Sequence, residues 1–142
     1  MEATNKPQVT VSTLINAPVD KVWKAWSTPE DIMQWNNASD DWHSPSSEND
    51  LRTGGTFKTR MEAKDGSMGF DFGGTYDDVQ TNKLIAYTMG DGRKVKVTFE
   101  SQGNQTLVTE TFEAESQNPV EMQRGGWQAI LDNFKKYAET NQ

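Results

Sequence analysis

The alternation of apolar and polar residues predicts several β-strands along the chain. The β-branched run QVTVSTLI at 8–15 suits a first strand with one buried face. Patterned segments separated by turn signals predict further strands at 55–64, 69–79, 83–89, 93–101 and 105–114. Short turns between consecutive strands indicate an antiparallel meander.

Two short helices and one long helix are predicted around these strands. Asn16 opens the first, with Pro18 in the first turn, where its missing N–H is not needed. A Thr-Pro pair gives the same start signal to a second helix at 29–35. Across 119–140, apolar residues recur at helical spacing, at Trp127, Ile130, Leu131, Phe134 and Ala138. We therefore predict an α+β fold, a curved antiparallel sheet wrapped around a long C-terminal helix, with two short helices after the first strand.

The Asp65-Gly66 pair is a hairpin signal that sets the register of the first hairpin in the meander. It places Arg60 opposite Asp71 on one face, and such opposite charges support a register by up to about 1 kcal/mol. The other face is then largely apolar, and it carries Phe57, Thr59, Met61, Phe70, Phe72 and Gly74.

The next hairpin has its turn signal at Asp91-Gly92. A two-residue loop there turns one set of residues inward and leaves Tyr87 outside. The predicted inward set is Leu84, Ala86, Thr88, Val95, Val97 and Phe99.

The last turn, around Gly103-Asn104, pairs Val97 with Glu110 and aims this carboxyl group into the interior. A buried lone charge is strongly unfavourable, so the group must be paired, hydrogen-bonded or hydrated. An odd loop or a bulge would instead turn Glu110 toward water. Both registers remain open, and we favour the inward one.

An inward acid fits the wall of a cavity better than a dry core, and Gly125 and Gly126 leave space in the long helix. Each glycine costs about 1 kcal/mol in a helix interior, unless the helix begins only at Gly126 after an irregular segment. The predicted ligand-binding residues are Trp35, Trp42, Phe57, Thr59, Met61, Phe70, Phe72, Tyr76, Val97, Glu110, Phe112, Gly126, Trp127 and Ile130.

The length and composition of the chain limit the classes of partner and site that it can have. A chain of 142 residues suits a single domain over 1–142. Its net charge of −7 opposes binding to nucleic acid or to an anionic membrane. The absence of cysteine excludes disulfides and thiolate metal sites. With neither a signal-peptide pattern at the start nor an apolar stretch of membrane-spanning length, we expect a cytoplasmic protein.

The polar segment 36–52 is expected to be a loop at the cavity mouth. It holds His43, the only histidine, which with Glu110 is a candidate catalytic residue. His43 as base and Glu110 as protonated acid, with Arg60 or Tyr76 steadying an oxyanion, would make an enzyme. A single histidine among scattered acids falls short of the three or four convergent ligands of a metal site, so we expect no metal.

Three segments carry a resemblance to a known family: APVDKVWKAWSTPEDIMQW, FGGTYDDV and GWQAILDNFKKYAE. They resemble the family related to the activator of Hsp90 ATPase, within the START and Bet v 1-like superfamily. The similarity spans nearly the whole chain, and WNNASDDWHSPSSENDLRTGG is similar to a bacterial branch described only as a domain of unknown function. The resemblance implies a helix-grip fold whose cavity serves, elsewhere in the superfamily, for lipids, hormones, polyketides and flavonoid-like molecules.

We therefore expect a monomeric small-molecule-binding protein without a cofactor. Its ligand would be an apolar or amphipathic molecule, such as a lipid, a polyketide or a flavonoid-like compound. One alternative is an enzyme of the aromatase/cyclase or hydrolase type that uses His43 and Glu110. Another is a chaperone-associated interaction domain, with a chaperone partner implied by the family analogy.

Overall fold

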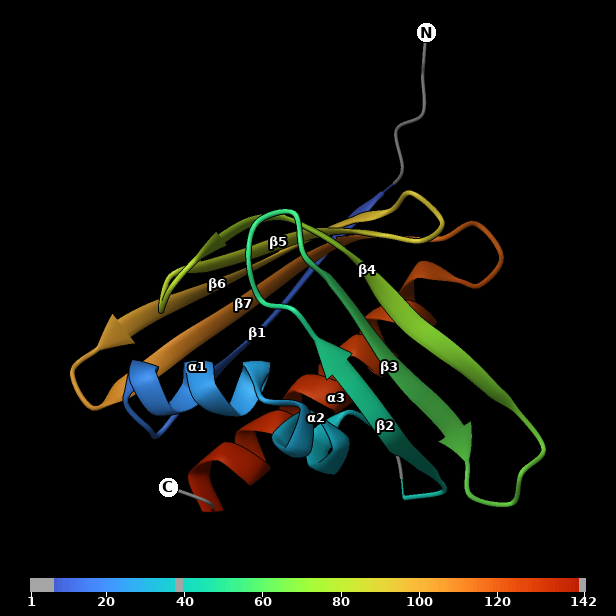
Figure 1. Ribbon diagram of the computed structural model, residues 1–142, viewed down its shortest axis with the longest axis horizontal. Helices are drawn as coiled ribbons and strands as arrows, with labels where there is room; N and C mark the ends of the chain where they lie inside the picture. Colours follow the sequence, from blue (N-terminus) through green and yellow to red (C-terminus); the bar gives the residue numbers. More distant parts are fainter. Residues whose placement is uncertain (1–6, 38–39, 141–142) are drawn as a thin grey trace, which may run out of the picture.

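The computed structural model describes residues 7–37 and 40–140, and its elements follow the predicted order with one additional strand (Figure 1). The strands are β1 (Gln8–Ile15), β2 (Trp42–Asn49), β3 (Thr56–Ala63), β4 (Gly69–Gln80), β5 (Leu84–Met89), β6 (Lys94–Gln102) and β7 (Gln105–Glu113). The helices are α1 (Val19–Ser27), α2 (Pro29–Trp35) and α3 (Val120–Thr140). The predicted α+β helix-grip architecture is confirmed. The first residues searched for a signal peptide, 1–6, lie outside the described part.

The seven strands form one antiparallel sheet in the order β1-β7-β6-β5-β4-β3-β2. The sheet curls, and α3 crosses its concave side, while α1 and α2 lie toward one end (Figure 1). The apolar core lies between the inner sheet face and the helices. Within the described residues, no helix is both long and apolar enough to cross a membrane.

The start of α1 differs from the prediction. The helix begins at Val19, and Pro18 occupies the N-cap position with extended backbone angles and no side-chain cap. Asn16 is therefore not the residue that opens the helix. Pro18 is tolerated because the N–H groups at a helix start have no carbonyl partner within the helix.

The prediction of a loop throughout 36–52 is wrong, because β2 forms there and pairs antiparallel with β3. The segment WHSPSSEN lacks the apolar alternation of a half-buried strand. It is an edge strand, and its register shifts between His43 and Ser46, where Pro45 lies. Proline is compatible with an edge strand or bulge because no ladder N–H is required of it there. Residues 38–39 of this segment lie outside the described part.

The register of the first hairpin is confirmed. Met61 pairs with Phe70, and Arg60 pairs with Asp71, with Nη1 and Oδ1 separated by 3.5 Å. The last hairpin is also as predicted, since Val97 pairs with Glu110 and directs the acid inward.

The register of the middle hairpin is wrong by one residue. The Met89 N–H donates to the Arg93 carbonyl at 2.8 Å, which leaves a three-residue loop in which Gly92 has a φ of 92°. The additional loop residue pairs Tyr87 with Val95 and turns Tyr87 inward. A shift of one residue reverses every side chain of a strand, so β5 buries Ile85 and Tyr87 where the prediction named Leu84, Ala86 and Thr88.

Candidate functional site

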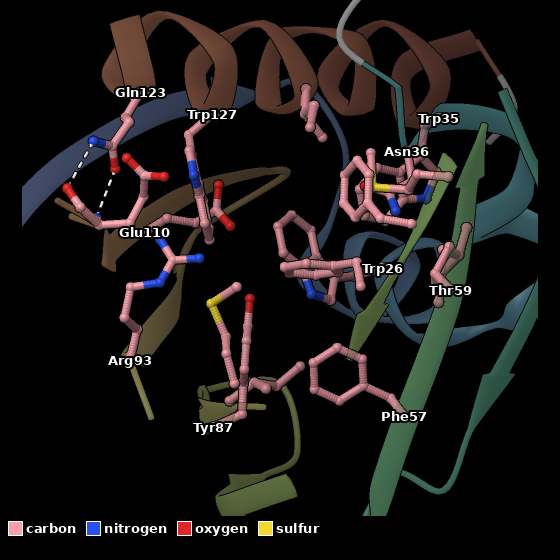
Figure 2. Close-up of a pocket in the computed structure, with 18 of the residues that line it drawn as sticks. Trp26, Trp35, Asn36, Phe57, Thr59, Tyr87, Arg93, Glu110, Gln123 and Trp127 are labelled. Atoms are coloured by element: carbon pink, nitrogen blue, oxygen red, sulfur yellow. Dashed lines mark hydrogen bonds between the residues drawn. The ribbon is translucent and has the colours of Figure 1, made fainter. Parts of the chain in front are cut away.

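A pocket of about 300 Å³ lies between the concave sheet face and α3 (Figure 2). This size is at the lower end of the range for small-molecule sites. Its apolar wall is formed by Trp26, Ile32, Trp35, Phe57, Met61, Phe70, Phe72, Ile85, Met89, Trp127 and Ile130. The polar wall residues are Asn36, Thr59, Tyr76, Tyr87, Arg93, Glu110, Glu115, Asn118 and Gln123.

Aromatic rings that contact one another form much of the apolar wall. The Phe57 ring centroid lies 4.8 Å from that of Tyr87, 5.0 Å from that of Tyr76 and 5.7 Å from that of Phe72. On the helix side, Trp127 stacks on Phe112 with centroids 4.0 Å apart. Such packed rings keep a fixed orientation, so they offer a flat apolar ligand a preformed surface.

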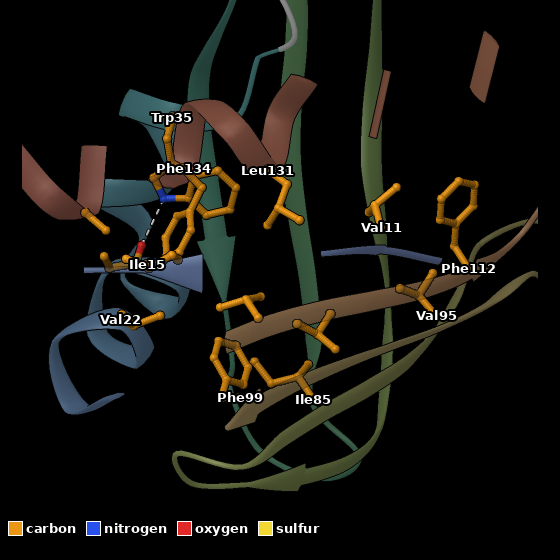
Figure 3. Packing of buried hydrophobic residues seen from close by; sticks show 14 of the residues in the cluster. Val11, Ile15, Val22, Trp35, Ile85, Val95, Phe99, Phe112, Leu131 and Phe134 are labelled. Carbon is orange, nitrogen blue, oxygen red and sulfur yellow. Dashed lines mark hydrogen bonds between the residues drawn. The ribbon is translucent and has the colours of Figure 1, made fainter. Parts of the chain in front are cut away.

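The C-terminal half of α3, in contrast, packs on a filled core (Figure 3). Leu131 and Phe134 are fully buried, and the Phe134 ring lies 4.8 Å from that of Trp35. The Trp35 indole N–H donates to the Ala25 carbonyl at 2.9 Å. The core and the pocket therefore lie under different parts of the same helix.

Gly73 and Gly74 in β4 lie where the neighbouring strands approach closely. Gly74 pairs with Phe57 on one side and with Met89 on the other. A Cβ atom at Gly74 would lie 2.3 Å from the Thr88 carbonyl oxygen, and at Gly73 it would lie 2.5 Å from the Phe57 carbonyl oxygen. Only glycine allows the three backbones to approach this closely.

One end of the pocket gathers polar groups, two of which have no hydrogen-bond partner among the described residues. Figure 2 shows Arg93, Glu110 and Tyr87 at this end, with Trp127 beside them. Glu110 is 5% exposed, and no described residue forms a hydrogen bond or an ion pair with its carboxyl group. Burial raises the pKa of Glu110 to about 8, so the group is largely protonated at neutral pH. The buried Tyr87 hydroxyl has no hydrogen bond to any described residue, and burial followed by the nearby Glu110 raises its pKa.

The polar groups at the other end are satisfied within the protein. The Tyr76 hydroxyl donates to Asn49, and burial raises its pKa. The Thr59 and Ser47 hydroxyls lie 3.0 Å apart, and the Ser44 hydroxyl donates to the Asn36 carbonyl at 2.8 Å. The two ends thus differ in the hydrogen bonds that they leave available to a ligand.

Most of the predicted ligand-binding residues lie in the pocket wall: Trp35, Phe57, Thr59, Met61, Phe70, Phe72, Tyr76, Glu110, Trp127 and Ile130. Four do not. Val97 and Phe112 are fully buried in the core, and Trp127 covers Phe112. Trp42 contacts Phe70 at 6.0 Å between centroids without lining the pocket, and Gly126 has nothing near its Cβ direction. Contact between any of these residues and a ligand stays a prediction.

The long helix is continuous from Val120, so the alternative start at Gly126 is wrong. A Cβ atom at Gly125 or Gly126 would meet nothing within 4 Å apart from neighbouring helix backbone. Neither glycine is therefore required by close packing.

Several wall residues were not predicted from the sequence. Ile85, Tyr87 and Met89 were lost with the register of the middle hairpin, and the Gly90-Asp91-Gly92 run was the signal for a three-residue loop. The others reach the pocket only through the tertiary fold, and these are Trp26, Ile32, Asn36, Arg93, Glu115, Asn118 and Gln123.

The structure does not bring His43 and Glu110 together. His43 pairs with Glu62, and its Nε2 lies 3.8 Å from the Glu62 carboxylate. Glu62 alternates with the inward Met61, so this contact lies on the outer face, together with Arg60 and Asp71. The predicted acid–base pair is wrong, because its members occupy opposite faces of the sheet. Among the described residues, no three or more His, Asp or Glu side chains are grouped to hold a metal ion.

Comparison with known proteins gives consistent matches over most of the chain. The model of the family described as Activator of Hsp90 ATPase homolog 1-like protein matches residues 16–139. An AHSA1-like protein from Aeromonas hydrophila is 45% identical, with a TM-score of 0.89, over 94% of this chain and 93% of that one. A protein from Cytophaga hutchinsonii is 54% identical, with a TM-score of 0.82 and the same coverage of 94% and 93%.

More distant similarity extends to the fold alone. A protein from Nitrosomonas europaea is 19% identical, with a TM-score of 0.82, over 95% of this chain and 96% of that one. None of the curated proteins matches the chain.

Proposed function

This chain belongs to the Activator of Hsp90 ATPase homolog 1-like family, and from this premise we propose that it is a small-molecule-binding protein. Its ligand is an apolar or amphipathic molecule of lipid, polyketide or flavonoid-like character, held between the sheet and α3. The observation that carries the proposal is the ring-lined pocket of about 300 Å³ with a polar end.

The rings alone account for weak binding. A ligand that buries about 200 Å² of apolar surface gains about 5 kcal/mol at 25 cal/mol per Å². Association costs at least about 4 kcal/mol in lost translational and rotational freedom. Tight binding therefore requires polar contacts as well, and the unpaired groups at the Glu110 end are available to make them.

Thermal stabilisation by a panel of lipids, flavonoids and polyketide-like compounds tests this function. A ligand present at about 100 times its Kd adds about 2.7 kcal/mol and raises the Tm by several degrees. Met89→Trp places a larger side chain in the pocket wall and is expected to abolish the shift. Met122→Trp is the matched control, because Met122 is 64% exposed on α3 and outside the wall.

The proposal fails if no compound class stabilises the wild-type protein. It also fails if the two tryptophan variants respond to a ligand equally, because binding would then lie outside the pocket. A Met89→Trp protein that still unfolds cooperatively excludes simple misfolding as the reason for a lost shift.

Binding is proposed ahead of catalysis because the enzyme alternative depended on His43 and Glu110 acting together. Interaction with a chaperone partner stays a prediction from the family. A docking surface would need a group of exposed apolar side chains. Among the described residues, the large exposed apolar side chains are Leu14, Met68, Phe70 and Met122. Only Met68 and Phe70 belong to the same hairpin. Cytoplasmic location, the monomeric state and the exclusion of cofactor, nucleic-acid and membrane partners also stay predictions.

A further inference from the structure

We infer that the polar end of the pocket binds a carboxylate head group, with Glu110, Tyr87 and Arg93 as three convergent hydrogen-bond donors. The inference rests on the proposed function and specifies the chemistry of its ligand, an amphipathic carboxylic acid whose tail lies against the rings. Figure 2 shows the three donor side chains at the same end of the pocket.

The first reason is that two buried groups lack partners among the described residues. Protonated Glu110 and the Tyr87 hydroxyl each carry one O–H donor. A buried donor that finds no acceptor costs about 1 to 3 kcal/mol. A ligand oxygen that accepts from both groups removes this cost. An apolar ligand end at the same position would leave both O–H donors without an acceptor.

The second reason is the charge of Arg93. Its side chain is 15% exposed, and its Nε donates to Asp91 at 2.7 Å. One Nη1 hydrogen points to the Glu113 carbonyl at a distance of 3.5 Å. A guanidinium has five N–H donors, so others remain to face the pocket that Arg93 lines. A cation there attracts a carboxylate and repels an ammonium group.

Asp91 forms an ion pair with the Arg93 Nε, and of the other pocket-lining groups around Glu110 only Glu115 is acidic. Tyr87 faces this end of the pocket from β5, and α3 contributes uncharged Gln123 and Trp127, whereas Tyr76 donates to Asn49 at the other end. The partner of Glu110 on β1 is Val11. Glu115 lines the pocket, but its carboxylate accepts the backbone N–H groups of residues 117 and 118 and the Asn118 amide, which hold it in the turn after β7.

A pH dependence follows from the same geometry. Below about pH 8 Glu110 is protonated and donates to the ligand carboxylate. Above it, Glu110 loses its proton, no longer donates, and repels the ligand. Because the free protein must then take up one proton at Glu110 in order to bind the carboxylate, affinity falls by up to about tenfold per pH unit. A simple carboxylic acid, with a pKa near 4, stays ionised throughout.

Calorimetric titration of the full chain with decanoate, decan-1-ol and decylamine tests the inference, since the three probes share one tail. At pH 7 we expect decanoate to bind at least about tenfold more tightly than either other probe. Between pH 7 and pH 9.5 its affinity should fall at least about tenfold in the wild type. In Glu110→Gln, whose amide donates at every pH, the affinity should change less than about twofold.

Tyr87→Phe is the second variant, because it retains the ring and removes one donor. It should weaken decanoate by about three- to tenfold and weaken decan-1-ol less, because a neutral hydroxyl is the weaker acceptor. Equal affinity for the three probes, or the same pH profile in wild type and Glu110→Gln, overturns the inference while leaving a ligand-binding pocket. Failure of all three probes to bind also overturns it, and the proposed function is then judged by the thermal panel and the tryptophan variants.

Discussion

Glu110 is a buried acid on β7 that lines the pocket. Alternation along β7 turns it inward with Thr106, Val108 and Phe112. The other inward residues of β7 are apolar or uncharged. Burial raises the pKa of the Glu110 carboxyl group to about 8, because a buried carboxylate charge is unfavourable. The chain thus retains an acid where packing alone does not require one.

This raised pKa predicts how stability depends on pH. The native protein holds the Glu110 proton more tightly than the unfolded chain, so the stabilising effect is fully present below the unfolded pKa of about 4.5 and is lost as pH rises through about 8. The loss amounts to about 5 kcal/mol at most, at about 1.4 kcal/mol per unit. Urea unfolding of wild type and Glu110→Gln at pH 5 and pH 9 measures it. The variant should gain stability relative to wild type at pH 9, and an equal difference at both pH values would contradict the prediction.

At the scale of elements, the two groups of glycines have different roles. Gly74 in β4 allows neighbouring strands to approach, whereas the α3 glycines face open space. The edge strand β2 shows a related contrast. It forms because β3 offers an unpaired edge, although its own sequence has little strand character.

Alanine substitutions distinguish the two kinds of glycine. Gly74→Ala should cost more than about 2 kcal/mol, because its Cβ would lie 2.3 Å from the Thr88 carbonyl oxygen. Gly126→Ala should stabilise the protein by up to about 1 kcal/mol through higher helix propensity. Thermal unfolding of both variants provides the comparison. Similar losses at the two sites would show that Gly126 is also constrained.

At the scale of the whole molecule, α3 covers two different interiors. Its C-terminal half buries Leu131, Phe134 and Ala138 in the core, and its N-terminal half lies over the pocket. A helix segment with fewer buried apolar contacts opens more easily by local unfolding. The C-terminal half of α3 is therefore expected to be rigid, and the N-terminal half, over the pocket, is expected to open more easily.

Amide hydrogen exchange measures this difference. Exchange at 120–127 should be faster than at 131–138, since only the second segment is anchored by fully buried side chains. A ligand bound in the pocket should slow exchange in the first segment and leave the second nearly unchanged. Uniform protection along α3 before ligand is added would contradict this division.

Local sequence patterns were sufficient to predict most of the elements and two of the hairpin registers. Helical and strand periodicities are local properties, and the turn residues fixed the pairs Met61–Phe70 and Val97–Glu110. The pairing of β2 depends on the edge that β3 offers. The register of β5 depends on the Gly90-Asp91-Gly92 run forming a three-residue loop, whose added residue reverses the strand. Only the tertiary structure brought Arg93 and Gln123 to the end of the pocket that holds Glu110, because contacts between distant segments depend on how the sheet curls beneath α3 and on no local pattern.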